Sequence, residues 1–415
     1  MLITNWARNV TFGARRLHRP ASLDELCAVV AGADRIRALG SGHSFNRIAD
    51  TPGDLVSVAD LPRVMDVDSV RGTVTVSAGL RYGDVAPHLH AAGFALHNLG
   101  SLPHISIAGA CATGTHGSGV ANGTLASAVT ALDLVTADGA VRTLRRDDEL
   151  FPAAVVSLGA LGVVTSLTLD VRPRFDVAQF VYDDLPLDAA RTHLAEIMAR
   201  GYSVSLFTDW ARPRFNQVWV KRRAEDGPPP HDWFGATPAD GPRHPVPGMS
   251  TEHCTEQLGV PGPWHARLPH FRLEFTPSSG EELQSEFFVP HTEAPEALAA
   301  LDRIGDRIAP VLQISEVRAI AAEDLWLSPS YQRDTVAFHF TWIKDPDAVV
   351  PVLAAVEEAL APFDARPHWG KLFTMGPRVV AARYERVRDF GALTRRLDPA
   401  GKFRNDFLDR YVPSP

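Results

Sequence analysis

Residues 39–46 read Leu-Gly-Ser-Gly-His-Ser-Phe-Asn and follow a short strand-like run that begins at Arg35. Glycine permits sharp turns and lets the backbone approach a ligand closely, because it has no Cβ atom. His43 is therefore presented on a tight turn. Two interpretations are open from these residues alone. The loop either holds the polar part of a cofactor, with His43 touching or bonded to its reactive ring, or it is a strand-ending turn capped by a histidine.

A second glycine-rich loop, residues 99–119, consists almost entirely of small side chains. Small residues leave backbone N–H groups open, and successive N–H groups form concavities that bind phosphate oxygens. A tight loop packed against another backbone would have the same composition. The length of the loop and its hydroxyl groups favour a polar ligand. These hydroxyl groups belong to Ser101, Ser106, Thr113, Thr115 and Ser118.

Neither loop matches the two common nucleotide-binding patterns. The Gly40-Ser41-Gly42 start lacks the third glycine of the Rossmann fingerprint at its expected place. No Gly-Lys-Ser/Thr sequence follows a glycine loop, as a Walker-type phosphate loop requires. A dinucleotide would therefore have to bind in a non-Rossmann mode.

The composition describes a globular protein: of 415 residues, 45% are hydrophobic and 22% are charged, with a net charge of −8. This length predicts two domains. The negative charge argues against a nucleic-acid or anionic-membrane partner, since phosphate binding needs a basic surface. The N-terminus has no apolar signal segment, and no uninterrupted apolar run is long enough to span a bilayer.

The cysteines predict neither a disulfide framework nor a zinc site, because they are odd in number and widely spaced. They are Cys27, Cys111 and Cys254. A reducing compartment suits free thiols. We therefore expect a cytoplasmic protein without a bound metal, and we expect it to be a monomer.

The pattern of apolar residues is mixed α and β. Helices are expected at 20–31, with Ser22 as N-cap, and at 82–92, 184–198 and 294–308. Strands are expected at 55–58, 64–67, 74–77, 132–135, 312–320 and 336–342, and after a glycine bend within 158–169. A proline- and glycine-rich loop occupies 224–250. The glycine-rich loops stop near residue 172, where we place a domain boundary.

Polar residues interrupt the apolar strands of the second half. The period of two puts Glu316 and Arg318 on one face of their strand, as a structural ion pair or as part of an interior site. His339 and Thr341 share a face of the next strand, with aromatic residues on the other face. Lys371 follows a glycine and precedes Leu-Phe, which is an unusual place for a surface lysine.

Several separated motifs, in one order along the chain, resemble the vanillyl-alcohol oxidase family of FAD flavoproteins and its sugar-alcohol branch. They are Gly-Ser-Gly-His-Ser at 40–44, Ala-Thr-Gly-Thr-His-Gly at 112–117, Thr-Asp-Trp at 208–210, Arg-Pro-His-Trp-Gly-Lys at 366–371 and Asp-Pro-Ala-Gly-Lys-Phe at 398–403. The resemblance implies an α+β fold of two domains. The two domains are a PCMH-type FAD-binding domain over 1–172 and a substrate-binding cap domain with a mixed sheet over 173–375. A C-terminal segment, 376–415, is expected to return to the FAD domain.

The resemblance also implies FAD as cofactor, with His43 bonded to the flavin 8α-methyl group. Some relatives add a second link through a cysteine that here is replaced by Leu102, so one link is expected. Gly100 would leave room for dioxygen, which favours an oxidase over a dehydrogenase. The residues expected around FAD are Ser41, Gly42, His43, Ser44, Phe45, Ser101, Ser106, Gly109, Thr113, Gly114, Thr115, His116, Gly117 and Val163.

The implied activity is oxidation of the terminal hydroxyl of alditols, of the xylitol or sorbitol type, to aldoses, with dioxygen reduced to hydrogen peroxide. His339 is the expected base, and Arg318 or Lys371 is expected to support the charge of the reduced flavin. The residues expected to bind substrate hydroxyls are Ser101, Glu316, Arg318, Thr341 and Lys371. Two alternatives stay open: a sugar-1,4-lactone oxidase or dehydrogenase, and a flavin-binding protein without turnover. The last would more often have apolar residues where this chain has charges, because unpaired buried charge is costly.

Overall fold

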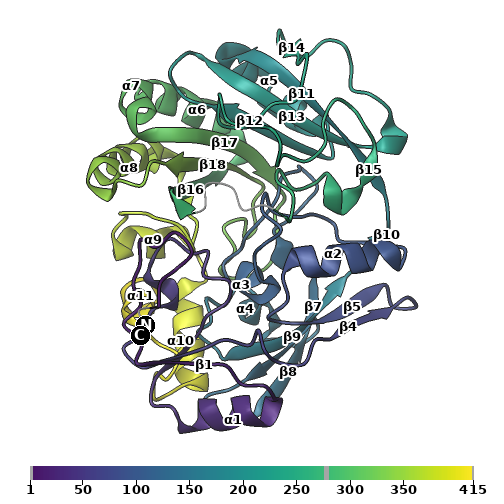
Figure 1. The fold of residues 1–415 in the computed structure, drawn as a ribbon. Helices are drawn as coiled ribbons and strands as arrows, with labels where there is room; N and C mark the ends of the chain where they lie inside the picture. Colours follow the sequence, from purple (N-terminus) through teal and green to yellow (C-terminus); the bar gives the residue numbers. More distant parts are fainter. Residues whose placement is uncertain (1–2, 275–279, 414–415) are drawn as a thin grey trace.

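The computed structural model describes residues 3–274 and 280–413. Two halves are stacked on each other (Figure 1). The lower half in that view contains the N-terminal residues, in purple and blue, together with the yellow C-terminal helices. The upper half, in teal and green, is built on one large sheet. No helix in these two described ranges combines the length and the apolarity needed to cross a bilayer.

The first half contains an antiparallel sheet of five described strands in the order β4-β5-β9-β7-β8. Their bounds are Met65–Asp68 (β4), Thr73–Ser77 (β5), Val129–Val135 (β7), Val141–Arg145 (β8) and Val163–Asp170 (β9). The short strands Phe94–Ala95 (β6) and Arg172–Pro173 (β10) pair separately. The helices are Tyr82–Ala91 (α2), Ile107–Ala112 (α3) and Phe151–Ala154 (α4). In β5, Val74 and Val76 are fully buried while the alternating Thr73 and Thr75 are partly exposed, as a period of two predicts.

A small parallel sheet leads directly into residues 39–46, the His43 loop. Its order is β1-β3-β2, and the bounds are Arg16–His18, Asp54–Val56 and Ile36–Ala38. Helix α1 (Leu23–Gly32) confirms the predicted N-cap, since the Ser22 hydroxyl accepts from the backbone N–H of Glu25 at 3.2 Å. Leu26 and Val30 of α1 are fully buried. The packed helix fixes the strand that ends immediately before residue 39.

The second half contains a sheet of nine described strands, whose path is β14-β11-β13-β12-β17-β18-β16-β19, with β15 paired to β11. The bounds are Asp176–Pro186 (β11), Ser203–Thr208 (β12), Arg214–Arg223 (β13), Thr237–Pro238 (β14), Gly262–Pro263 (β15), Leu283–Pro290 (β16), Leu312–Ile320 (β17), Thr335–Trp342 (β18) and Arg366–Pro367 (β19). Helices Leu187–Ala199 (α5), Ala294–Asp302 (α6) and Pro346–Leu360 (α8) pack on one another and on the sheet. In β17 and β18, Glu316 lies opposite His339.

Two predicted helices are corrected. The helix predicted at 184–198 is wrong in its first turn, because β11 continues through these residues and pairs Leu185 with Phe215 and Pro186 with Arg214. Pairing with a neighbouring strand overrides the local helix signal there. The helix predicted at 294–308 is two helices, α6 and Gly305–Ile308 (α7), separated where Ile304 leaves the helical region at φ −115°.

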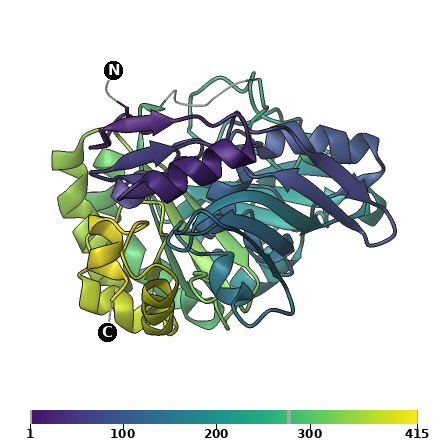
Figure 2. The same ribbon diagram turned by 90° about the horizontal axis from the view of Figure 1, so that it is seen from below.

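The C-terminal segment lies against the first half. It contains helices Pro377–Arg383 (α9), Val387–Leu397 (α10) and Asp406–Tyr411 (α11), which are yellow in Figure 2. The side-chain amide of Asn405 donates to three backbone carbonyls between residues 47 and 50, at 3.2, 3.0 and 2.7 Å. Lys402 Nζ donates to the carbonyl of Val30 at 2.7 Å. The domain limits at 172 and 375 stay predictions.

Candidate active site

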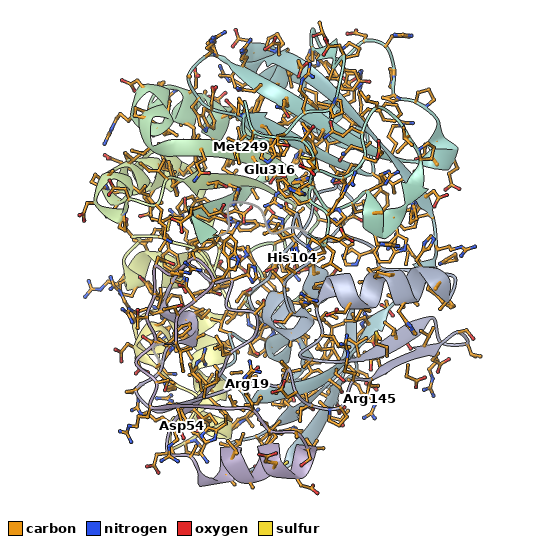
Figure 3. All side chains as sticks on the ribbon, viewed as in Figure 1. Arg19, Asp54, His104, Arg145, Met249 and Glu316 are labelled. Atoms are coloured by element: carbon orange, nitrogen blue, oxygen red, sulfur yellow. The ribbon has the colours of Figure 1, made fainter. Side chains whose placement is uncertain are left out.

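A cavity of about 490 Å³ lies between the two halves. The first half lines it with the two glycine-rich loops, and the second half lines it with β16, β17, β18 and residues 244–249. In Figure 3, Glu316 and Met249 mark the second-half side of this region. The volume is in the range of small-molecule and cofactor sites.

The His43 loop is held from both sides. The backbone N–H of Trp6 donates to the carbonyl of Gly42 at 2.8 Å, and Gly42 has a φ of +72°, which favours glycine. On the other side, the Asn46 amide donates to the carbonyls of Trp369 and Lys371, each at 2.8 Å. The loop therefore shares a rigid connection with the turn that carries Lys371.

The two glycine-rich loops are joined to each other. The Ser41 backbone N–H donates to the Ser106 hydroxyl at 3.3 Å, and the Ser106 N–H donates to the Ser41 hydroxyl at 3.1 Å. A Cβ atom on Gly40 would lie 2.5 Å from the Ser106 hydroxyl. A larger residue at position 40 would therefore displace the Ser106 hydroxyl that joins the two loops.

The His43 imidazole is stacked on Trp6, with ring centroids 5.0 Å apart and an interplanar angle of 18°. Both of its ring nitrogens are buried, and neither has a hydrogen-bond partner of good geometry within residues 3–274 and 280–413. Burial, followed by the charge of His104, lowers the pKa of His43 to about 4. A neutral, buried imidazole with unpartnered nitrogens, facing a cavity, fits a residue that holds a bound aromatic group.

Glu286 on β16 is the centre of the charged cluster. Its two carboxylate oxygens lie 2.6 Å from Arg318 Nη2, 2.7 Å from Lys371 Nζ and 3.2 Å from His116 Nε2. The carboxylate is 1% exposed. Burial acts to raise the pKa of Glu286, but the charges of Lys371, His116 and Arg318 outweigh it and hold that pKa well below its usual value.

His339 is held in one tautomer by its neighbours on β16. The Gln284 amide N–H donates to the Glu282 carboxylate at 2.5 Å, so the amide oxygen faces His339 Nε2 at 3.1 Å. An amide oxygen only accepts, so Nε2 carries the proton and Nδ1 keeps a lone pair. Nδ1 is buried and has no partner among the described residues. Burial, followed by the charge of Lys371, lowers the pKa of His339 well below 6.5.

Glu316 and Arg318 form an ion pair and also lie at the wall of the cavity, so both interpretations of this pair apply. Arg318 Nε lies 3.6 Å from a Glu316 oxygen, which is an ion pair, and both side chains line the cavity. Arg318 Nη1 also donates to the Ser101 hydroxyl at 3.5 Å. A carboxylate, a guanidinium and a hydroxyl group therefore meet at one wall.

Most of the residues predicted for the site line the cavity. These are Ser41, Gly42, His43, Ser44, Phe45, Ser101, Ser106, Gly109, Thr113, Thr115, His116, Glu316, Arg318, His339, Thr341 and Lys371. Three residues predicted to contact FAD do not line it: Gly114, Gly117 and Val163. Gly117 serves packing, because a Cβ there would lie 2.4 Å from the carbonyl of Leu99. No group of three or more His, Cys, Asp or Glu side chains within the described ranges is arranged to bind a metal ion.

Four of the polar or flexible cavity-wall residues that were not predicted are Gln284, Glu286, His270 and Met249. Gln284 and Glu286 share one face of β16, and the period of two in Leu-Gln-Ser-Glu-Phe, residues 283–287, could have indicated them. His270 and Met249 lie in irregular segments. Such segments have no period, so no sequence signal indicates which side chains face inward.

Two protein families match this chain in separate regions. Residues 14–145 match the family described as FAD binding domain. Residues 280–411 match the family described as D-arabinono-1,4-lactone oxidase. The first match contains both the His43 loop and the whole second glycine-rich loop, and the second contains Glu286, Glu316, His339 and Lys371.

Similar proteins cover the whole chain. An alditol oxidase of Streptomyces sp. is 55% identical over 98% of this chain and 98% of the relative. An L-gulono-1,4-lactone dehydrogenase of Mycobacterium tuberculosis is 31% identical over 99% and 98%. The crystal structure of cholesterol oxidase from B. sterolicum matches with a TM-score of 0.78 at 15% identity, covering 99% of this chain and 96% of that one. A xylooligosaccharide oxidase from Myceliophthora thermophila matches with a TM-score of 0.74 at 14% identity, covering 99% and 94%.

The structural matches confirm the expected two-domain α+β fold, and the sequence matches confirm FAD as the cofactor. The chain therefore belongs to the vanillyl-alcohol oxidase family of FAD-dependent oxidoreductases, within the group of the alditol oxidases.

Proposed function

We propose that this enzyme oxidises the terminal hydroxyl of alditols of the xylitol or sorbitol type to the aldose, while dioxygen is reduced to hydrogen peroxide. The observation that carries the proposal is the full-length likeness to the Streptomyces alditol oxidase. The cavity wall supports it. A carboxylate, hydroxyls and cationic donors converge there from Glu316, Ser101, Thr341, Arg318 and Lys371, as an uncharged polyol requires.

The side chains divide the work of the oxidation. FAD, held by the two glycine-rich loops, would supply the acceptor for the hydride of the hydroxyl-bearing carbon and the route of the electrons to dioxygen. His339 accepts the hydroxyl proton at Nδ1, the nitrogen whose lone pair is unpartnered. Arg318 and Lys371 keep positive charge in a buried site, where it stabilises developing negative charge strongly.

Anaerobic mixing with a panel of sugar alcohols, lactones and aldoses tests this function. Xylitol or sorbitol should bleach the flavin fastest, with peroxide formed when oxygen is admitted. The match of residues 280–411 to a lactone oxidase family supports one competing function, a sugar-1,4-lactone oxidase or dehydrogenase. Fast bleaching by a 1,4-lactone without bleaching by alditols would establish that function instead. A flavin that no compound of the panel reduces would contradict both.

We further propose that His43 carries a covalent link to the flavin and that it is the single link. Leu102 lines the cavity where some relatives have a cysteine, while Cys111 faces Tyr82 at 3.6 Å and does not line the cavity. Acid precipitation should leave the yellow colour with the parent protein, and His43→Ala should release it into the supernatant. His104→Gln is the matched control, because His104 lies nearby but does not line the cavity. Colour retained by His43→Ala would place the bond elsewhere.

A cytoplasmic monomer stays a prediction. The described cysteines are all free, with Cys111 and Cys254 buried and Cys27 partly buried. Free thiols suit a reducing compartment.

A further inference from the structure

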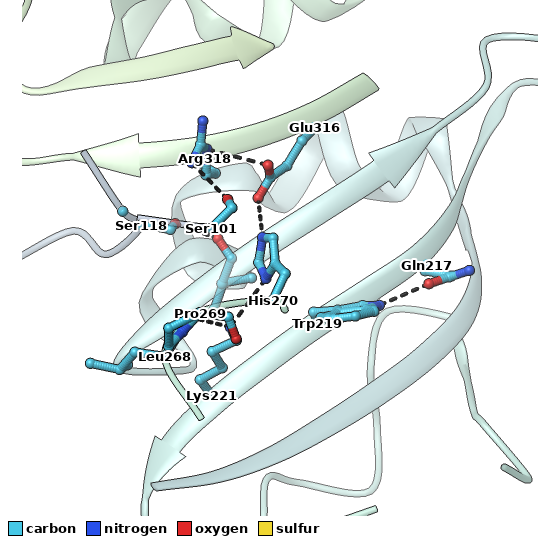
Figure 4. Close-up of polar contacts among 12 residues, drawn as sticks. Ser101, Ser118, Gln217, Trp219, Lys221, Leu268, Pro269, His270, Glu316 and Arg318 are labelled. Carbon is cyan, nitrogen blue, oxygen red and sulfur yellow. Dashed lines mark hydrogen bonds and ion pairs between the residues drawn. The ribbon is translucent and has the colours of Figure 1, made fainter. Parts of the chain in front are cut away.

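A chain of three buried polar side chains leads away from the cavity wall behind Glu316 (Figure 4). His270 Nε2 lies 2.8 Å from a Glu316 carboxylate oxygen, and His270 Nδ1 lies 3.1 Å from Lys221 Nζ. Glu316 and His270 line the cavity, whereas Lys221 does not. All three residues are at most 5% exposed. Lys221 can therefore influence a substrate only through its neighbours.

The contacts of Lys221 and Glu316 together determine where the proton of His270 lies, because Glu316 is an ionised carboxylate that only accepts. The Lys221 ammonium group has three donors and no acceptor. Two of these donors point to the carbonyls of Leu268 and Pro269, and the third points to His270 Nδ1. Nδ1 must then be the acceptor, so the proton of the neutral imidazole lies on Nε2 and is donated to Glu316. Burial, followed by the charge of Lys221, lowers the pKa of His270 to about 4, which keeps the ring neutral.

Residues 268–271, which contain these contacts of Lys221, are also bound to Ser101 of the first half. The backbone N–H groups of His270 and Phe271 both point to the carbonyl of Ser101, at 3.1 and 3.4 Å. The His270 ring is packed edge-on against Phe207 and Trp219, with centroids 5.5 and 5.2 Å away. His270 is therefore fixed between Ser101 and Glu316, which both line the cavity.

We propose that Lys221 and His270 are positioning residues for the oxidation: Lys221 holds His270 in the Nε2–H tautomer, and His270 orients the Glu316 carboxylate toward the hydroxyls of the polyol. The inference rests on the proposed function for the identity of the substrate. Arg318 contacts the other oxygen of Glu316, at 3.6 Å. The carboxylate is thus held at both oxygens, and Glu316 lines the cavity.

The first experiment needs no substrate. The ring-nitrogen shifts of His270 are measured in ¹⁵N-histidine-labelled holoenzyme at pH 6, because burial lowers the pKa of Lys221 to about 7. The signals of His270 are identified by their loss in His270→Gln, since the chain has 16 histidines. The Nε2–H form is expected in the parent. In Lys221→Met the doubly protonated ring should gain population at Nδ1, because the charge of Lys221 is one of the causes that lower the pKa of His270. An Nδ1–H form in the parent would overturn the proposal, whether or not alditols are substrates.

The second experiment is a double-mutant cycle on anaerobic flavin reduction by xylitol. His270→Phe keeps the ring packing and should raise KM about 10- to 100-fold, the worth of a hydrogen bond to a charged group, with kcat changed far less. In a Glu316→Gln background the same change should have little further effect, because His270 acts through that carboxylate. His270→Gln, which can still donate to Glu316, should recover much of the lost affinity.

Trp219→Phe is the matched control. It removes the indole bond to Gln217 at 2.8 Å but keeps an aromatic ring against His270, so KM should stay within about twofold of the parent value. The proposal would be overturned if the rise in KM of the double variant equalled the product of the rises in His270→Phe and Glu316→Gln. A rise of KM in Trp219→Phe as large as that in His270→Phe would also overturn it. A parent enzyme that xylitol does not reduce would contradict the proposed function and leave the tautomer result to decide the role of Lys221.

Discussion

Replacing His339 by asparagine should slow anaerobic flavin reduction by xylitol about 10²- to 10⁴-fold, the usual contribution of a positioned general base. The unpartnered Nδ1 of His339 is the base that this substitution removes, because an amide group in its place does not take up a proton. Stopped-flow flavin bleaching at saturating xylitol measures the rate. The flavin content of the variant should equal that of the parent, because the proposed tether is His43. A reduction rate within about tenfold of the parent would remove His339 from the role of base.

The pH profile provides an independent check of the same residue. A base loses activity when it is protonated, that is, below its pKa. Burial and the charge of Lys371 lower the pKa of His339 well below 6.5. The value of kcat for xylitol should therefore stay level from pH 8 down to 6.5, and the acid limb attributable to His339 should lie below 6.5. An acid limb of the rate profile centred at or above pH 6.5 would contradict the burial of the His339 imidazole as the cause of its lowered pKa.

The site residues that could be predicted from the sequence are those whose placement follows from a short-range rule. The period of two in a strand places Glu316 beside Arg318 and His339 beside Thr341, and in β17 and β18 all four side chains line the cavity. The glycine pattern of residues 40–44 likewise indicates a sharp turn. Such rules are local, so they hold whatever the rest of the fold does.

The parts of the site that the sequence did not predict depend on long-range packing. Glu286 precedes Phe-Phe-Val, so its strand resembles ordinary core, and only the approach of Arg318, Lys371 and His116 makes a buried carboxylate tolerable there. Lys221 follows Val-Trp-Val in β13 and resembles an edge lysine until residues 268–270 close over it. These partners come from segments far away in the sequence, and neither composition nor periodicity indicates that they meet.

Replacing Glu286 by glutamine should lower the free energy of unfolding by about 3–5 kcal/mol, because removing one partner of a buried ion pair leaves the other charges uncompensated. Here Arg318 and Lys371 would lose the carboxylate that contacts them at 2.6 and 2.7 Å. Urea denaturation of the holoenzyme measures the change as a lower midpoint at constant m. Adding Lys371→Met to Glu286→Gln should recover part of the loss, since one unpaired charge is removed together with its partner.

The pH dependence of this stability difference follows from the lowered pKa of Glu286. A carboxylate whose pKa is lower in the folded state stabilises the protein above its unfolded pKa, about 4.5, and the stabilisation is lost as the pH falls through the folded pKa. The gap between parent and Glu286→Gln should therefore be constant from pH 8 to about 5.5 and should close only under more acid conditions. A gap that closes near neutral pH, or a variant as stable as the parent at pH 7, would mean that Arg318 and Lys371 are compensated by groups other than Glu286. Glu316, the other carboxylate beside Arg318, would then be the group that compensates the positive charge of the cavity.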